Sequence, residues 1–200
     1  MVITEITRLE KGRVRVSFDT ANPLVFYKSE IRGLGLEEQM PIDAGLYEHL
    51  FYEIVGKRAV KRAMHLLEKM DRTEWQLRKK LEQGDYPVEL IDQAVAYVKS
   101  YRYLDDDRYA RTFVRLNQER KSMGRIRMDL LSRGIPKDLI EHALEEENET
   151  PQGRLIEKLL QKKNYDKDSA TLLETKKIYQ FLIRRGFRSE EILPYIRCAE

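Results

Sequence analysis

Apolar and polar side chains alternate with the period of a β-strand over residues 1 to about 40. In the clearest stretch, Val14, Val16 and Phe18 alternate with polar residues, and an apolar and aromatic run follows at residues 24–27. A turn at residues 19–23 separates the two, since proline disfavours helix in the residue before it. The pattern predicts an antiparallel sheet of two or three strands. Such a sheet is marginal alone and should pack on a neighbouring helix.

The period then changes to that of a helix, from about residue 44 to residue 70. Residues 41–43 have the composition of a helix start, and Gly56 is a possible interruption. The side chains predicted to face inward are Leu46, Leu50, Ile54, Ala59, Ala63, Leu66 and Leu67.

From residue 70 onwards a pattern occurs three times. Each copy has a helix that ends at a glycine (Gly84, Gly134 and Gly186), followed by a second apolar helix. Each glycine has an apolar residue three positions before it, and each copy is preceded by a further apolar helix, at residues 59–70, 109–117 and 155–161. In the first copy Thr73 is the expected helix cap and Pro87 the expected start of the next helix. The sequence therefore predicts three copies of a three-helix unit.

The central copy, residues 103–135, has the strongest pattern. An apolar arc faces inward on its first helix, and a spine of Ile126, Leu130 and Leu131 faces inward on its second. Gly134 is expected in a left-handed helix cap. The carboxylates of Asp105, Asp106 and Asp107 stand where they can cap a helix or contact a partner. The arc consists of Tyr109, Ala110, Phe113, Val114 and Leu116.

These patterns together predict a mainly α protein: an elongated, curved tandem array of three three-helix repeats, preceded by a small β-rich segment. The expected boundaries are 1–42 for the β-rich segment, 43–103 for the first repeat with its lead-in helix, 104–149 for the second and 150–200 for the third. An acidic run at residues 145–149 ends the second repeat, and residues 150–151 start the third.

Charge adds a local feature to this picture. The whole chain carries only +3, but residues 108–133 hold eight Lys and Arg against two acidic residues. Arg108, Arg111 and Arg115 form a stripe opposite the apolar arc, with no partner expected at i,i+4 spacing. Such a stripe is either a solvated helix face or a contact for an anionic partner. The basic candidates for that contact are Arg108, Arg111, Arg115, Arg120, Lys121, Arg125, Arg127, Lys57, Arg58, Lys61, Arg62, Lys162, Lys163, Arg184 and Arg185.

Catalytic and metal signatures are absent from the sequence. The single cysteine, Cys198, excludes a disulfide framework, and the histidines lack metal-ligand spacing. We expect no enzyme, no cofactor and no metal, with residues 105–107 better explained by capping or partner contact. No segment has the pattern of a signal peptide or membrane span, which favours a cytoplasmic protein. Trp75 and the tyrosines have helical spacing beside leucines and are expected in the core.

The central motifs resemble those of the RecX regulatory family. The family pattern has Tyr-Leu-Asp-Asp, then Tyr-Ala, then Lys-x-x-Gly, then Leu-x-x-(Lys/Arg)-Gly-Ile, and the flanking copies are similar to its first and third repeats, so the resemblance covers about residues 57–199. The matching residues are Tyr103, Leu104, Asp105, Asp106, Tyr109, Ala110, Lys121, Gly124, Leu131, Arg133, Gly134 and Ile135.

The resemblance implies a non-enzymatic regulator in DNA recombination and repair. Such proteins bind the filament of RecA recombinase on DNA and modulate, typically by inhibiting, its strand exchange, ATPase and co-protease activities. The implied partners are the RecA filament and DNA, the latter contacted weakly and without sequence preference, and the implied state is a monomer. Two alternatives remain open from the residues: a helix-turn-helix DNA reader and a helical-repeat adaptor for another partner.

Overall fold

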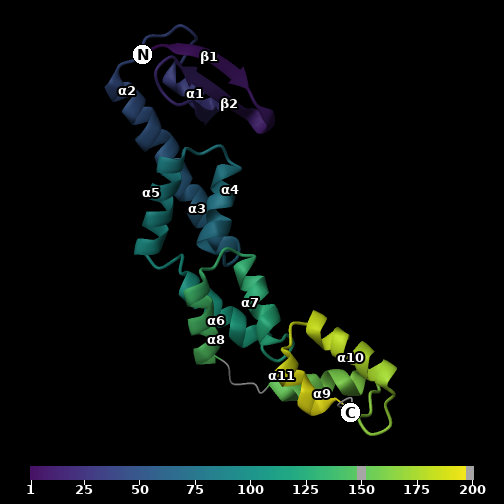
Figure 1. The fold of residues 1–200 in the computed structure, drawn as a ribbon. Coiled ribbons are helices and arrows are strands. Elements are labelled where there is room, and N and C mark those ends of the chain that lie inside the picture. Colours follow the sequence, from purple (N-terminus) through teal and green to yellow (C-terminus); the bar gives the residue numbers. More distant parts are fainter. Residues whose placement is uncertain (148–151, 197–200) are drawn as a thin grey trace. The chain divides into compact units, whose positions relative to one another are not determined.

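The computed structural model describes residues 1–147 and 152–196 of the chain. The chain divides into two compact units, Met1–Asp105 and Asp106–Glu200 (Figure 1). The fold is mainly helical with a three-stranded N-terminal sheet, so the predicted fold class is confirmed. The elongated, curved shape and the four domain boundaries stay predictions. In the described part of the chain, no helix is long and apolar enough to cross a membrane.

The first unit begins with an antiparallel sheet in the order β1 (Ile3–Arg8), β2 (Arg13–Phe18) and β3 (Leu24–Tyr27), as the alternating pattern predicts. A short 3-10 turn, η1 (Glu10–Gly12), joins the first two strands. The sequence analysis missed the helix α1 (Lys28–Leu34) after β3. The carboxylate of Glu30 accepts a hydrogen bond from the Tyr27 backbone N–H at 2.7 Å, and Gly35 ends the helix in the left-handed conformation.

The helical pattern at residues 44–70 corresponds to three consecutive segments: α2 (Ala44–Glu48), η2 (His49–Gly56) and α3 (Lys57–Lys69). Asp43 caps the first of them by accepting a hydrogen bond from the Leu46 N–H at 2.7 Å. The middle segment has π-helical geometry and ends at Gly56, the glycine at which an interruption was expected.

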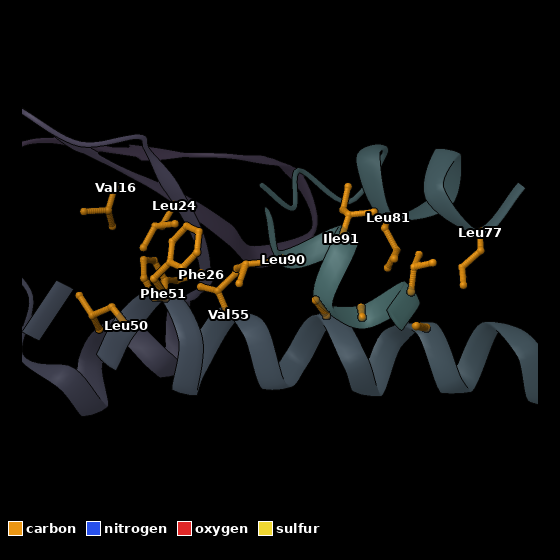
Figure 2. Close-up of a cluster of buried hydrophobic side chains, with 14 of the residues drawn as sticks. Val16, Leu24, Phe26, Leu50, Phe51, Val55, Leu77, Leu81, Leu90 and Ile91 are labelled. Atoms are coloured by element: carbon orange, nitrogen blue, oxygen red, sulfur yellow. The ribbon is translucent and has the colours of Figure 1, made fainter. Parts of the chain in front are cut away.

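The sheet and the first helices share one apolar core. Figure 2 shows side chains of the sheet, including Val16, Leu24 and Phe26, gathered above Phe51 and Val55 of η2. All five are buried, and the same cluster continues along α3 to the helices of the first repeat. The expectation that the sheet packs on a neighbouring helix is therefore confirmed.

The first repeat is completed by α4 (Glu74–Glu82) and α5 (Val88–Ser100), which pack on α3 (Figure 1). Thr73 caps α4 through its hydroxyl, as predicted. The left-handed residue after α4 is Asp85 (φ 59°) instead of Gly84. The backbone N–H of Tyr86 bonds the carbonyl of Leu81, the bond that Ile135 and Phe187 make to Leu130 and Leu182. Asp85 is thus the structural counterpart of Gly134 and Gly186, and the predicted alignment on Gly84 was one residue off.

The second repeat consists of α6 (Asp106–Asn117), α7 (Met123–Leu131) and α8 (Lys137–Glu147) around a core of its own. Gly134 has the expected left-handed φ of +77°. Two predicted inward residues are wrong: Leu116 is 71% exposed and Leu131 is 41% exposed. Each lies at the edge of its apolar arc, where a 3.6-residue period distinguishes inside from outside poorly.

The third repeat consists of α9 (Gln152–Lys162), α10 (Leu172–Arg184), α11 (Ser189–Ile192) and a final turn, η3 (Leu193–Tyr195). Its core includes Ile156, Leu182 and Phe187. The expected helix start at residues 150–151, the end of the acidic run at residues 148–149, and Cys198 lie outside the described residues.

Candidate functional site

The predicted arginine stripe on α6 faces carboxylates of its own unit. Arg111 contacts Asp107 at 2.9 Å and Glu146 of α8 at 2.5 Å, and Arg115 lies 3.9 Å from Glu147. The expectation that the stripe lacks an i,i+4 partner is therefore wrong, because Asp107 occupies that position. The acidic end of α8 supplies the remaining partners through tertiary packing.

A second arginine of this repeat is also used internally. Both guanidinium Nε and Nη2 of Arg127 donate to Glu141 of α8 at 2.7 Å, in a bidentate pair. The hydrogen bond from Arg127 lowers the pKa of Glu141, and the same bond raises the pKa of Arg127. The hydrogen bond to Asp107 likewise raises the pKa of Arg111. These pairs stabilise the α6–α8 and α7–α8 contacts and leave little net charge on that face.

In the first unit the basic candidates have different surroundings. Arg58 donates to the carboxylate of Glu30 and to the backbone carbonyl of Val25, and its guanidinium lies over the rings of Tyr27 and Tyr86. It joins α3 to the sheet. Lys57 pairs with Glu53 in a bridge between exposed side chains.

Two further cations of α3, Lys61 and Arg62, are exposed and line an open groove of about 450 Å³. Tyr27 and Tyr86 form part of its wall. In the third repeat, Lys163 and Arg185 lie over the ring of Phe181, at 5.1 and 4.9 Å from its centroid. Lys162 and Arg184 are exposed at the ends of α9 and α10.

Within the second unit, the N-terminus of α7 meets the turn that follows α10. The hydroxyl of Ser122, which caps α7, donates a hydrogen bond to the carbonyl of Arg185 at 2.5 Å. Gly124 and Gly186 lie so close that a Cβ on Gly124 would be 2.2 Å from the Gly186 carbonyl oxygen. Gly186 has φ +88°, a conformation that favours glycine. We call this contact the glycine joint.

The glycine joint brings together basic candidates that are about sixty residues apart in sequence. They surround a hollow of about 400 Å³, which we call the basic hollow. Buried apolar side chains, among them Leu155 and Phe187, form its floor. Among the described residues that line it, none is acidic. Its cations are Arg120, Lys121, Arg125, Arg184 and Arg185.

One carboxylate beside the basic hollow orients two of these cations. Asp129, whose side chain is 16% exposed, lies 2.8 Å from Lys121 Nζ and 3.0 Å from Arg125 Nε. No ion pair within residues 1–147 and 152–196 involves Arg120 or Arg184. In the described part of the chain, one carboxylate therefore pairs with two of the five cations, which leaves the basic hollow with an excess of positive charge.

The acidic candidates begin α6. Asp106 and Asp107 form its first turn, where carboxylates interact favourably with the helix dipole, and Asp107 pairs with Arg111. Asp105 precedes the helix and has an interaction partner within the protein. In the described part of the chain, no group of three or more His, Cys, Asp or Glu side chains is arranged to hold a metal ion.

Sequence reasoning missed an exposed aromatic surface. Tyr97 of α5 and Tyr101, which follows the helix, are in ring contact with centroids 4.9 Å apart, and Tyr101 stacks on Tyr103 at 5.9 Å. All three are 40% exposed or more, as is Trp75. Their expected place in the core is therefore wrong. The signal in the sequence was weak, because Tyr97 and Tyr101 are three residues after Ala94 and Val98 and so lie at the edge of the buried face of α5.

Comparisons with known proteins match the repeats individually and the chain as a whole. Family models for the first and the second three-helix domain of RecX match residues 59–97 and 105–144. The regulatory protein RecX of Caldanaerobacter subterraneus subsp. tengcongensis is 32% identical over 194 residues, which cover 96% of either chain. That of Clostridium botulinum strain Alaska E43 is 27% identical and covers 96% of this chain and 92% of its own.

Solved structures agree with these matches. A crystal structure of regulatory protein RecX covers 96% of this chain and 97% of its own, with a TM-score of 0.66 at 26% identity. The structure of RecX from Lactobacillus salivarius, at 24% identity, shares the fold over 70% of this chain with a TM-score of 0.59. Full-length similarity in sequence, together with the same arrangement of helices, shows that this chain belongs to the RecX family of regulatory proteins.

Proposed function

We propose that this protein binds the filament of RecA recombinase on DNA and inhibits its ATPase, strand-exchange and co-protease activities. Membership of the RecX family, along the whole chain, is the observation that carries this proposal. In this proposal the protein acts in the cytoplasm as a monomer, without a cofactor and without catalysis of its own.

The distribution of charge supports a partner that combines protein and nucleic acid. The basic hollow offers a concentrated positive charge. In contrast, Arg111 and Arg127 of the second repeat pair with carboxylates of α8. Naked DNA alone would favour a uniformly basic surface. A filament offers phosphates and protein surface together, which fits a chain with a net charge of only +3.

The arrangement of α8 argues against the helix-turn-helix alternative. A recognition helix presents Arg, Asn or Gln to base edges in the major groove. Instead, α8 carries Glu141, Glu146 and Glu147, each paired with an arginine of the same repeat. Side chains paired in this way do not offer the hydrogen-bond donors and acceptors that read base edges.

The test is a titration of the protein into RecA that is hydrolysing ATP on single-stranded DNA. We expect the steady-state rate to fall at protein concentrations well below that of RecA, because each molecule acts on a filament instead of a single subunit. An unchanged rate at every ratio would contradict the proposal.

A second arm of the titration separates filament binding from simple removal of DNA. The assay is repeated with a large excess of single-stranded DNA. Inhibition through the filament should persist, whereas inhibition by sequestering DNA should disappear. A protein that binds a different partner, the adaptor alternative, would leave RecA unaffected in both arms.

A further inference from the structure

We infer that the basic hollow at the glycine joint is a phosphodiester-binding site, through which the protein holds a single strand of nucleic acid. This inference rests on the proposed function for the presence of nucleic acid where the protein acts. It assigns the nucleic-acid contact to this hollow and not to the arginine stripe on α6.

The two basic surfaces of the second unit differ in how many of their cations are paired. On α6 and α7, Arg111, Arg115 and Arg127 each have a carboxylate of α8 within 4 Å. In the basic hollow, the one carboxylate that pairs with cations in the described chain is Asp129, which contacts two of the five. Like charges held together without enough counter-charges raise the local potential and favour an external anion.

The fold itself holds the cations of the basic hollow together. Arg120, Lys121 and Arg125 surround the N-terminus of α7, and Arg184 and Arg185 end α10. The glycine joint fixes one group against the other through the Ser122 hydrogen bond and the close backbone contact. A site that is already formed loses less free energy to side-chain and loop ordering when a ligand binds.

The side chains of the basic hollow match a phosphate ligand better than a protein one. Four of the five cations are arginines, whose forked donors match phosphate oxygens, and Lys121 adds a point charge. The apolar floor does not offer an anchor for a protein partner, because Leu155 and Phe187 are only 6% and 3% exposed. Protein interfaces depend on exposed aromatic and aliphatic anchors at their centre. Recognition here therefore depends on charge, as it does for a phosphate backbone.

Backbone amides at the N-terminus of α7 contribute little to the basic hollow. Backbone N–H groups at the start of α7 are already used: Met123 donates to the side chain of Gln152, and Arg125 to Ser122. Side chains, instead of backbone amides, must hold the ligand. Among the described residues, Arg120, Arg184 and Arg185 have no ion pair, and Arg185 already lies over the ring of Phe181. Arg120 and Arg184 are therefore the cations whose loss should matter most.

The experiment measures binding of the full chain to a fluorescent, mixed-sequence single-stranded oligonucleotide by anisotropy, without RecA. The variant is Arg120→Ala/Arg184→Ala. We expect affinity to fall by about tenfold or more, since charge-assisted hydrogen bonds are lost. The slope of log affinity against log salt should decrease by about 1.4, or about 0.7 for each of two phosphate contacts.

The matched control is Lys176→Ala/Lys177→Ala, which removes the same charge from exposed positions on α10 that do not line the basic hollow. Its affinity should change less than that of the test variant by a wide margin. Equal weakening by the two double variants, or no weakening by either, would overturn the inference. Thermal unfolding of both variants should match that of the parent protein. If the test variant is less stable, Arg120→Gln and Arg184→Gln are measured separately.

Two further comparisons complete the test. Arg120→Lys/Arg184→Lys should bind more tightly than the alanine variant but less tightly than the parent protein, because the charge stays while the forked donors are lost. Binding of a poly-glutamate peptide is measured in parallel. Loss of peptide binding with unchanged oligonucleotide binding would show an acidic protein ligand and overturn the inference. Because no arm contains RecA, failure here is distinct from failure of the proposed function in the ATPase titration.

Discussion

At the scale of single residues, the surroundings of an arginine determine its role. Arg58, Arg111 and Arg120 belong to similar basic runs in the sequence, yet their partners differ. Arg58 has a carboxylate, a carbonyl and two aromatic rings around it, and its side chain is 17% exposed. Arg111 pairs with two carboxylates. Arg120 is exposed at the edge of the basic hollow.

Arg58 is therefore expected to act in stability, although the sequence places it among the contact candidates. Arg58→Ala should lower the free energy of unfolding by about 2 kcal/mol, because Glu30 and the Val25 carbonyl lose a charged donor at a partly buried site. Lys61→Ala, at an exposed position of the same helix, should stay within about 0.5 kcal/mol of the parent. Chemical denaturation measures both. Equal losses for the two variants would show that Arg58 has no special structural role.

Sequence reasoning was limited at this scale to neighbours along one helix. Spacing along the helix can show whether Arg111 has a counter-charge three or four residues away. Asp107 occupies such a position, but the sequence analysis interpreted it as a helix cap or partner contact. It cannot show that Glu146, thirty-five residues later, lies 2.5 Å from the same guanidinium. That pairing depends on the packing of α6 on α8, which no local pattern encodes.

At the scale of elements, the repeat pattern predicted the helices and their order well. Strand alternation and helical spacing are properties of each segment, so the sheet, α3 and the helices around Gly134 followed from the residues. The errors occur where one inserted residue shifts a register, as at Asp85, or where an aromatic residue lies on the outer face, as at Tyr101. The role of Gly124 was hidden for another reason. It depends on contact with a turn sixty residues away.

The glycine joint leads to a prediction about Gly124. Alanine normally stabilises a helix by about 1 kcal/mol relative to glycine. Here a Cβ would lie 2.2 Å from a backbone oxygen that cannot rotate away, so Gly124→Ala should instead lower the free energy of unfolding by about 1–3 kcal/mol. Gly124→Ala should also weaken oligonucleotide binding although it removes no charge, because the added methyl group pushes the two groups of cations in the basic hollow apart.

Gly33→Ala is the matched control for this prediction. Gly33 also lies in a helix, α1, but a Cβ there would meet nothing within 4 Å. Its substitution should leave stability unchanged or raise it by up to about 1 kcal/mol. Thermal and chemical unfolding of the two variants gives opposite signs if the close contact at Gly124 is real, and the same sign if it is not.

At the scale of the whole molecule, the apolar cores, more than the order of the elements, determine which segments depend on one another for stability. Within the residues that the structure describes, buried side chains form one apolar cluster in the first unit and two in the second. The cluster of the first unit runs from Ile3 to Leu104 and includes side chains of the sheet and of the first repeat. The N-terminal strands are therefore part of the packing of that repeat, a dependence that the sequence suggested only in general terms.

This shared core predicts how a shortened chain should behave. Removal of residues 1–42 takes away seven buried side chains from the core of the first unit: Ile3, Val16, Phe18, Leu24, Phe26, Leu36 and Ile42. At about 2 kcal/mol for each, their burial contributes about 14 kcal/mol, comparable with the whole stability of a domain. The fragment 43–200 should consequently have an unfolded segment up to about residue 105, with a second unit that stays folded.

Hydrogen exchange and limited proteolysis of the fragment 43–200 measure this outcome. Amides of α3 and α5 should exchange rapidly and be cleaved, while those of α6, α7 and α8 keep the protection they have in the full chain. The fragment 106–200 serves as the control and should unfold at the same temperature as the protected part. Native-like protection of α3 and α5 without the sheet would mean that the helices of the first repeat form a sufficient core by themselves. The strands would then have a role other than stability, and the surface of β1 and β2 would become a candidate for partner contact.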